Sequence, residues 1–117
     1  MTDGAPVSLA TAVERLGLTV CACGKKLDTP VTGAQVCDLL SHVMAHGKPG
    51  HLWITIQTHP NIVAVAALAR LAGIVIADGL EPGDDTVMRA EEEEIPLFTA
   101  SDSAFVLAGQ LYELGVR

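Results

Sequence analysis

Aromatic and basic residues are both scarce in this sequence of 117 residues. Only one Trp, one Tyr and two Phe are present, so the core must be built mainly from Val, Leu, Ile and Ala, which favours helices packed closely on a sheet. Seven Lys and Arg stand against fourteen Asp and Glu, which gives a formal net charge of -7. Because basic side chains supply most of the affinity for nucleic acids and for anionic membranes, the composition argues against both partners.

Long hydrophobic runs are also missing. A membrane-spanning helix needs about 20 apolar residues in succession, and the nearest run, 62–77, is interrupted by Arg70 and Gly73. Residues 1–6 lack the basic start and apolar stretch of a signal peptide, which predicts a cytoplasmic protein. In that compartment the three cysteines are expected to be free thiols.

Catalytic motifs are absent as well: there is no phosphate-binding GxxxxGK loop, no GxGxxG and no GxSxG. We therefore predict no catalytic residue, no cofactor and no enzymatic activity. His42 and His46 have the four-residue spacing that lets two imidazoles on a helix face one ion. No third ligand is assured, so we predict no bound metal. A thiolate trio of Cys21, Cys23 and Cys37 is the alternative to three separate thiols.

Hydrophobic periodicity alternates between strand and helix along the chain. Expected strands occupy 18–22, 51–57, 73–77 and 97–99, and an extended piece covers 29–32. Expected helices occupy 8–16 with Ser8 as the cap, 34–45, 61–71, 84–93, and 102–114 with Ser101 as the cap. The alternation predicts one α/β domain over 1–117, with a mainly parallel sheet and helices on both faces.

Polar residues gather where the predicted strands end and the next helices begin. Ligands of open α/β sheets favour the carboxyl ends of the strands, and free N–H groups at a helix start suit an anion. His59 is expected to strengthen anion binding as the pH falls, because its imidazole becomes charged. The simpler alternative is that these polar residues only cap the helices. Residues 21–24 are expected at the same edge of the sheet. The predicted ligand-binding residues are Gly33, Gln57, Thr58, His59, Asn61, Asp78 and Ser101.

The predicted helix 61–71 is apolar on all sides. Such a helix must be covered all round, and in a small domain a second subunit is one cover. We therefore expect a homo-oligomer, most simply a dimer. The alternative is a helix wedged centrally within one subunit.

Four stretches resemble the DRTGG domain family. They are DTPVTGAQVCDLLSHVM from Asp28, WITIQTHPNIVAVA from Trp53, IPLF from Ile95 and LYELG from Leu111. The resemblance covers nearly the whole chain from about residue 16 onward. One departure is that Ala34 replaces the second glycine of the motif that names the family, and the motif's Arg is not in its place.

The resemblance implies an α/β fold like the N-terminal domain of HPr kinase/phosphorylase. In that enzyme the kinase activity resides in a separate P-loop domain, and this chain contains no P-loop. The implied function is a non-catalytic regulatory or interaction domain that binds a small anionic ligand, such as a nucleotide, or a protein partner. Some stand-alone relatives are found near iron hydrogenase components. The alternative is therefore a small metal- or thiol-dependent accessory protein of a hydrogenase-type redox system.

Overall fold

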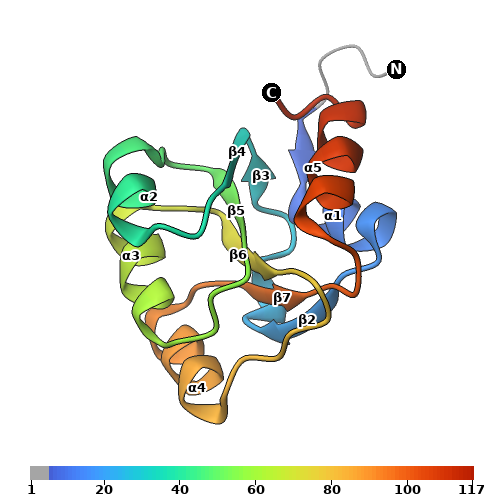
Figure 1. The fold of residues 1–117 in the computed structure, drawn as a ribbon. Helices are drawn as coiled ribbons and strands as arrows, with labels where there is room; N and C mark the ends of the chain where they lie inside the picture. The colour runs from blue at the N-terminus through green and yellow to red at the C-terminus, as the bar shows by residue number, and fades with distance from the viewer. Residues whose placement is uncertain (1–5) are drawn as a thin grey trace.

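A five-stranded sheet forms the centre of the computed structural model, which describes residues 6–117 (Figure 1). The strand order is β2-β7-β6-β5-β4. Strands β4, β5, β6 and β7 are parallel, and β2 runs antiparallel to β7 at one edge. The bounds are β2 Thr19–Ala22, β4 Gly33–Val36, β5 His51–Thr55, β6 Gly73–Ile76 and β7 Leu97–Thr99. Two short strands, β1 (Val7–Ser8) and β3 (Pro30–Val31), form a separate antiparallel pair.

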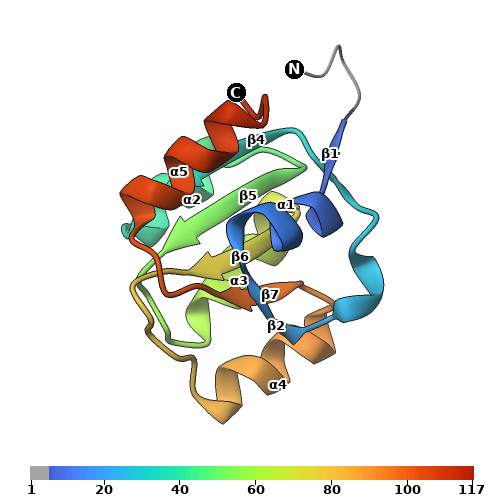
Figure 2. The ribbon, with the colours of Figure 1, turned by 90° about the vertical axis from the view of Figure 1, so that its right-hand side faces the viewer.

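Helices cover both faces of the sheet, which confirms the predicted fold class. On one face lie α2 (Leu40–His46), α3 (Asn61–Ala69) and α4 (Asp84–Glu93). On the other lie α1 (Leu9–Leu16) and α5 (Ala104–Glu113), which Figure 2 shows in front of the strands. None of the helices within residues 6–117 is long and apolar enough to cross a membrane.

Strand β6 and the middle of β5 are apolar because helices cover both sides of these central strands. Every residue of β6 is buried, as are the last four residues of β5. Trp53 in β5 is fully buried against the α2–α3–α4 layer, and its indole N–H donates to the Cys37 carbonyl at 2.7 Å. Phe98 fills the core on the opposite face. Trp53 and Phe98 are therefore the two aromatic side chains in a core that is otherwise aliphatic.

Helix α1 begins and ends as the sequence predicts. The Ser8 hydroxyl accepts a hydrogen bond from the Thr11 N–H at 3.2 Å, which satisfies one of the free donors of the first turn. Gly17 ends the helix in the left-handed conformation, with φ of 67°. Helix α4 and strand β7 also have the predicted bounds.

The predicted helix 34–45 is wrong in its first half. Residues Gly33–Val36 form β4, and the helix begins only at Leu40. Pairing with β5 satisfies the backbone of this segment, and the Cys37 N–H continues the ladder by donating to the Ile54 carbonyl at 3.2 Å. Only Val43 is fully buried among the residues whose spacing indicated an apolar helix stripe: Val36, Leu39, Leu40, Val43 and Met44. The apparent helical spacing thus arose from an edge strand followed by a short helix.

Ser103 caps the last helix in place of the predicted Ser101. Its hydroxyl accepts from the Val106 N–H at 3.3 Å. The helix starts late because the chain after β7 is tied to the loop after β6: the Asp78 N–H donates to the Asp102 carbonyl, and the Gly79 N–H donates to the Ala100 carbonyl. These bonds hold residues 100–102 outside the helix.

Candidate functional site

The carboxyl ends of β4, β5, β6 and β7 meet at one edge of the sheet, here called the carboxyl edge. Loops at this edge contain most of the predicted ligand-binding residues: Gln57, Thr58, His59, Asn61, Asp78 and Ser101. Gly33 lies elsewhere, because it begins β4 and pairs with His51 at the start of β5. The structure therefore brings six of the seven predicted residues to one edge and leaves Gly33 at the other.

Asp38 organises the loop after β5. Its Oδ1 atom accepts from the Thr55 hydroxyl at 2.8 Å and from the Ile56 N–H at 2.9 Å. The Gln57 side-chain amide donates to the Asp38 carbonyl at 3.0 Å. Gln57, a predicted ligand-binding residue, is thus already engaged in joining the β4–α2 loop to the end of β5.

Thr58 and His59 are engaged in the same way. The Thr58 carbonyl accepts from the hydroxyl of Thr86, a fully buried residue of α4, at 2.7 Å. The His59 Nδ1 atom accepts from the Asn61 N–H at 3.1 Å and so caps α3. The His59 Nδ1 atom is therefore already engaged within the loop.

Further N–H groups at the start of α3 also have partners. The Ile62 N–H donates to the His59 carbonyl at 3.1 Å, and the Val63 N–H donates to the Pro60 carbonyl at 3.0 Å. An anion at this helix start would have to compete with these bonds. Within the polar cluster, the side chains of Gln57 and His59 have an internal structural role, whereas Thr58 takes part through its backbone carbonyl. Binding of a ligand by the cluster remains a prediction.

Charge is distributed unevenly between the two ends of the sheet. In the loops at the carboxyl edge, every side chain of fixed charge is a carboxylate, and no Lys or Arg is present: Asp38, Asp78, Glu81, Asp84, Asp85 and Asp102. The loops at the opposite end, here called the amino edge, carry most of the basic residues: Lys25, Lys26, Lys48 and Arg70. The amino edge also carries carboxylates, among them Asp28, Glu93 and Glu94, so its charge is mixed. The carboxyl edge, whose fixed charges are all negative, repels an anion more strongly.

The segment 21–24 also lies at the amino edge, contrary to expectation. Because β2 is antiparallel to β7, its last residue, Ala22, pairs with Leu97 at the start of β7. The 3-10 turn η1 (Gly24–Lys26) follows there. Sequence alternation alone does not reveal that an edge strand reverses its direction.

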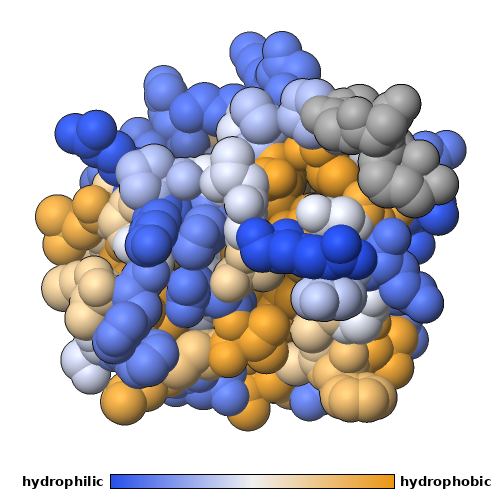
Figure 3. Space-filling view, turned by 90° about the horizontal axis from the view of Figure 1, so that it is seen from above, coloured by the Kyte–Doolittle hydropathy of each residue, from blue (hydrophilic) through white to orange (hydrophobic). Residues whose placement is uncertain are grey.

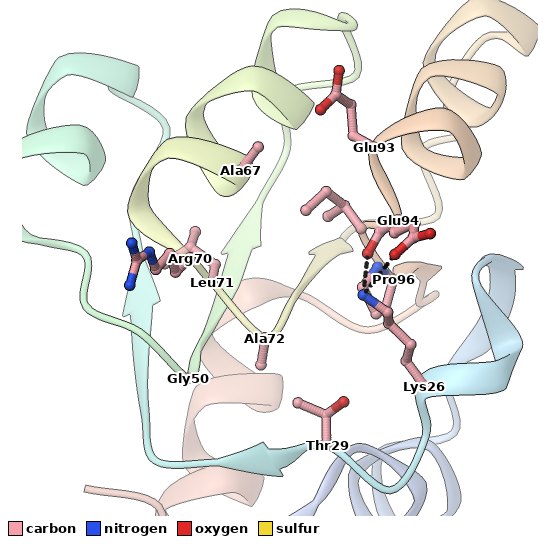
Figure 4. A pocket seen from close by; sticks show the side chains of 11 residues that line it. Lys26, Thr29, Gly50, Ala67, Arg70, Leu71, Ala72, Glu93, Glu94 and Pro96 are labelled. Atoms are coloured by element: carbon pink, nitrogen blue, oxygen red, sulfur yellow. Dashed lines mark hydrogen bonds and ion pairs between the residues drawn. The ribbon is translucent and has the colours of Figure 1, made fainter.

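Two hollows at the amino edge share Lys26 and Glu94 in their linings. The first, of about 320 Å³, lies between the ends of α3 and α4 and the start of β6 (Figure 4). The second, of about 360 Å³, is lined by η1 and the end of α4. Figure 4 shows the Lys26 ammonium group directed at Glu94, whereas the Arg70 guanidinium points away from Lys26.

Lys26 and Glu94 are joined by two weak links. The Lys26 Nζ atom donates to the Glu94 carbonyl at 3.0 Å and lies 3.6 Å from the Glu94 carboxylate. These side chains are 45% and 74% exposed, and such solvent-exposed ion pairs contribute only about 0–1 kcal/mol. Glu94 has φ of 59°, so it ends α4 in the left-handed conformation. Lys26 thereby compensates a carboxylate that the C-terminal end of a helix disfavours.

Cys23 provides a second connection between this turn and α4. Its N–H donates to the Glu91 carboxylate at 3.2 Å, and its thiol lies 3.4 Å from the Ala90 carbonyl. Burial raises the pKa of the Cys23 thiol above its usual range, and the Glu91 carboxylate raises it further. Burial also raises the pKa of Cys21. Both thiols are therefore weak nucleophiles at neutral pH.

The histidine pair predicted as a weak metal candidate is stacked. The rings of His42 and His46 are 4.2 Å apart between centroids, and the His46 Nδ1 atom is hydrogen-bonded to the His42 carbonyl. Within residues 6–117 no three His, Cys, Asp or Glu side chains are grouped as a metal site would require. All three cysteines are free thiols.

Sequence reasoning missed Asp38, Lys26 and Glu94. Asp38 meets Thr55 through the parallel pairing of β4 with β5, which no local motif records. Four glutamates in succession, 91–94, end helix α4, where carboxylates oppose the helix dipole. That conflict was the available signal for a nearby cation, although it did not identify Lys26.

Comparison with known proteins shows the fold but not the family. No protein-family model matches the chain, and a search of curated proteins finds no match. The structure is similar to that of the CBS and DRTGG domains of the regulatory region of Clostridium perfringens pyrophosphatase, complexed with the activator diadenosine tetraphosphate. The TM-score is 0.73 at 14% sequence identity, over 89% of this chain and 45% of that chain. This chain thus spans less than half of the polypeptide it resembles.

Proposed function

We propose that the chain is a non-catalytic regulatory domain that senses a small anionic ligand, with nucleotides as the first class to test. The similar fold belongs to the regulatory region of an enzyme and was determined with a nucleotide activator. Because 14% identity carries the fold alone, the ligand has to be argued from the charges and hollows of this chain.

The proposal rests on the exposed ion pair between Lys26 and Glu94. Lys26 stands between two hollows and is held by contacts of low energy. A phosphate group that enters either hollow can take the Lys26 ammonium group from Glu94, since a doubly charged phosphate attracts it more strongly than one carboxylate. Arg70 lines the first hollow, and its long side chain can turn toward the same phosphate.

Displacement of Glu94 gives a means of transmitting the binding event. Lys26 is the ion-pair partner of Glu94, and Cys23, three residues earlier, is bonded to Glu91 in the same helix turn. Release of Glu94 therefore loosens the contact between η1 and the end of α4. A partner domain or protein that touches either segment would detect the change.

Calorimetry with a panel of mono-, di- and dinucleoside polyphosphates tests the proposal. We expect Lys26→Ala to weaken binding by at least about tenfold, whereas Lys48→Ala, a cation outside both hollows, leaves it unchanged. His59→Ala serves as the contrast, because it removes the side chain predicted at the carboxyl edge. Loss of binding in His59→Ala but not in Lys26→Ala would move the site to that edge. Absence of binding by every nucleotide would contradict the proposed ligand class.

A further inference from the structure

Helix α5 has two apolar stripes, and only one of them faces the core. Leu107 and Leu111 are 0% and 1% exposed and pack against the sheet. On the outer side, Phe105, Val106 and Tyr112 are 87%, 41% and 60% exposed. No charged residue lies within 104–112, although the outer side of a surface helix normally carries charged or polar side chains. Phe105 is the most exposed large hydrophobic side chain in the described part of the chain.

The outer stripe has a shape suited to another helix. Its members follow the spacing of one helix face, and Gly109 lies between Phe105 and Tyr112. A Cβ atom placed on Gly109 would meet nothing within 4 Å, so the backbone is open to close approach there. A hollow of about 430 Å³ runs beside it, lined by Phe105, Val106, Ala108, Gly109, Gln110 and Glu113. Figure 3 shows apolar side chains at the surface on the side of the molecule where α5 lies.

Charged residues lie at both ends of the outer stripe: Asp102 at its start, and Glu113 and Arg117 at its end. Asp102 precedes α5. At the other end the Arg117 guanidinium lies 4.3 Å from the centroid of the Tyr112 ring and donates to the Tyr112 carbonyl at 3.2 Å. When two copies of α5 run in opposite directions, Asp102 of each copy lies at the end that carries Arg117 in the other, which is a favourable contact of opposite charges.

We propose that α5 is the contact surface of a homodimer, in which two copies of α5 cross antiparallel at Gly109. In this arrangement Val106 faces the partner's Tyr112, and Asp102 lies near the partner's Arg117. Antiparallel helix dipoles add a favourable term. Gln110 lines the same hollow, and its Oε1 atom is buried without a hydrogen-bond donor among the described residues.

Helix α3, the surface expected from the sequence to mediate a dimer, is covered within one subunit. It lies between α2 and α4, and its residues Ile62, Val63, Val65 and Ala66 are buried. Only Leu68 remains as a large exposed apolar side chain, at 71%. The all-round apolar character of α3 is thus explained by the central position that the sequence left as its alternative.

Analytical ultracentrifugation of wild type, Phe105→Glu and Leu68→Glu separates the two surfaces. A pair of short helices buries less than the ~1,200–2,000 Å² of most stable interfaces, so we expect a dissociation constant in the micromolar range. Phe105→Glu should raise it by at least about tenfold. Its fold should be kept, because Phe105 is exposed and a carboxylate in the first helical turn is favourable. Leu68→Glu should leave the dimer unchanged.

Cross-linking tests the crossing point independently. A disulfide forms only when two Cα atoms approach within about 7 Å. Gly109→Cys should therefore give a covalent dimer under mild oxidation, whereas Leu68→Cys and the wild type, with its three native thiols, should not. A monomer at all micromolar concentrations, a dimer weakened by Leu68→Glu but not by Phe105→Glu, or a dimer that Gly109→Cys does not cross-link would overturn the proposal. A different protein or domain on α5 would give the first of these results.

Discussion

Asp38 and Thr55 are 17 residues apart, yet the Asp38 carboxylate accepts a hydrogen bond of 2.8 Å from the Thr55 hydroxyl. Thr55 is only 1% exposed, so its hydroxyl depends on this partner. The same carboxylate oxygen also receives the Ile56 N–H. One side chain therefore fixes the point at which the chain leaves the central strand β5.

Asp38→Ala should lower the free energy of unfolding by about 1–3 kcal/mol, because it leaves a buried hydroxyl and a backbone N–H without their acceptor. Asp38→Asn keeps an acceptor oxygen and should lose less. Asp28→Ala, at an exposed residue of another loop, serves as the control. Urea unfolding followed by circular dichroism measures the difference. Equal stability of Asp38→Ala and Asp28→Ala would show that the bond is unimportant.

Thr86→Val should destabilise the loop between β5 and α3. The substitution preserves shape but removes the hydroxyl that donates to the Thr58 carbonyl at 2.7 Å. We expect a loss of about 1–3 kcal/mol, since the site is fully buried. Thr86→Ser retains the hydroxyl and should keep the bond. Hydrogen exchange should show faster exchange of amides in 57–63 for the Val variant only, and uniform exchange in both variants would argue against this role.

Gly33→Ala should destabilise the fold without any ligand present. A Cβ atom at this position would lie 2.7 Å from Nε2 of His51, whose Nδ1 atom is hydrogen-bonded to Gln35. We expect a cost of about 1–3 kcal/mol from the displaced ring. Gly24→Ala is the matched control, because its added Cβ atom would meet only Val20 Cγ1, at an ordinary contact distance of 3.5 Å, and it should leave the stability close to that of wild type. Thermal unfolding compares them, and a Gly33→Ala protein as stable as wild type would remove the packing explanation for this glycine.

Cys23 should react slowly with iodoacetamide at neutral pH. Burial and Glu91 raise its pKa, so the thiolate fraction grows only when the pH exceeds the usual thiol range. Glu91→Gln removes one cause, lowers the pKa and should speed alkylation at a fixed pH. Glu92→Gln changes the neighbouring charge, which has no contact with Cys23, and should have less effect. Mass spectrometry of the Cys23 peptide measures the rates, and equal rates in both variants would exclude the Glu91 effect.

Structural features that are determined by residues within one short segment were predicted well from the sequence. The bounds of α4 and β7 and the cap of α1 follow from local periodicity and capping chemistry, which the residues themselves contain. Errors arose where a distant segment decided the outcome. Residues 33–36 pair with β5 instead of continuing the helix, and bonds from Asp78 and Gly79 postpone the start of α5 past Ser101.

The candidate site shows the same division. The sequence correctly places Gln57, Thr58, His59 and Asp78 near one edge of the sheet, because residues that follow parallel strands must meet there. The hydrogen bonds that these residues already make depend on Asp38, Thr86 and Asp102, which come from other segments. The hollows around Lys26 depend on the reversed direction of β2, which only the assembled sheet defines.

The pairing of β2 with β7 has a consequence for the order in which the protein is made. Thr19 near the start of the chain has its strand partner in Thr99 near the end. On the ribosome, β4, β5 and β6 with their connecting helices can associate while β7 is still inside the exit tunnel. Until then β2 has no strand to join, and α1 has no completed sheet to cover. The nascent chain therefore exposes one apolar edge of β6 until residues 97–99 have emerged, and the addition of β7 is the step that closes the sheet.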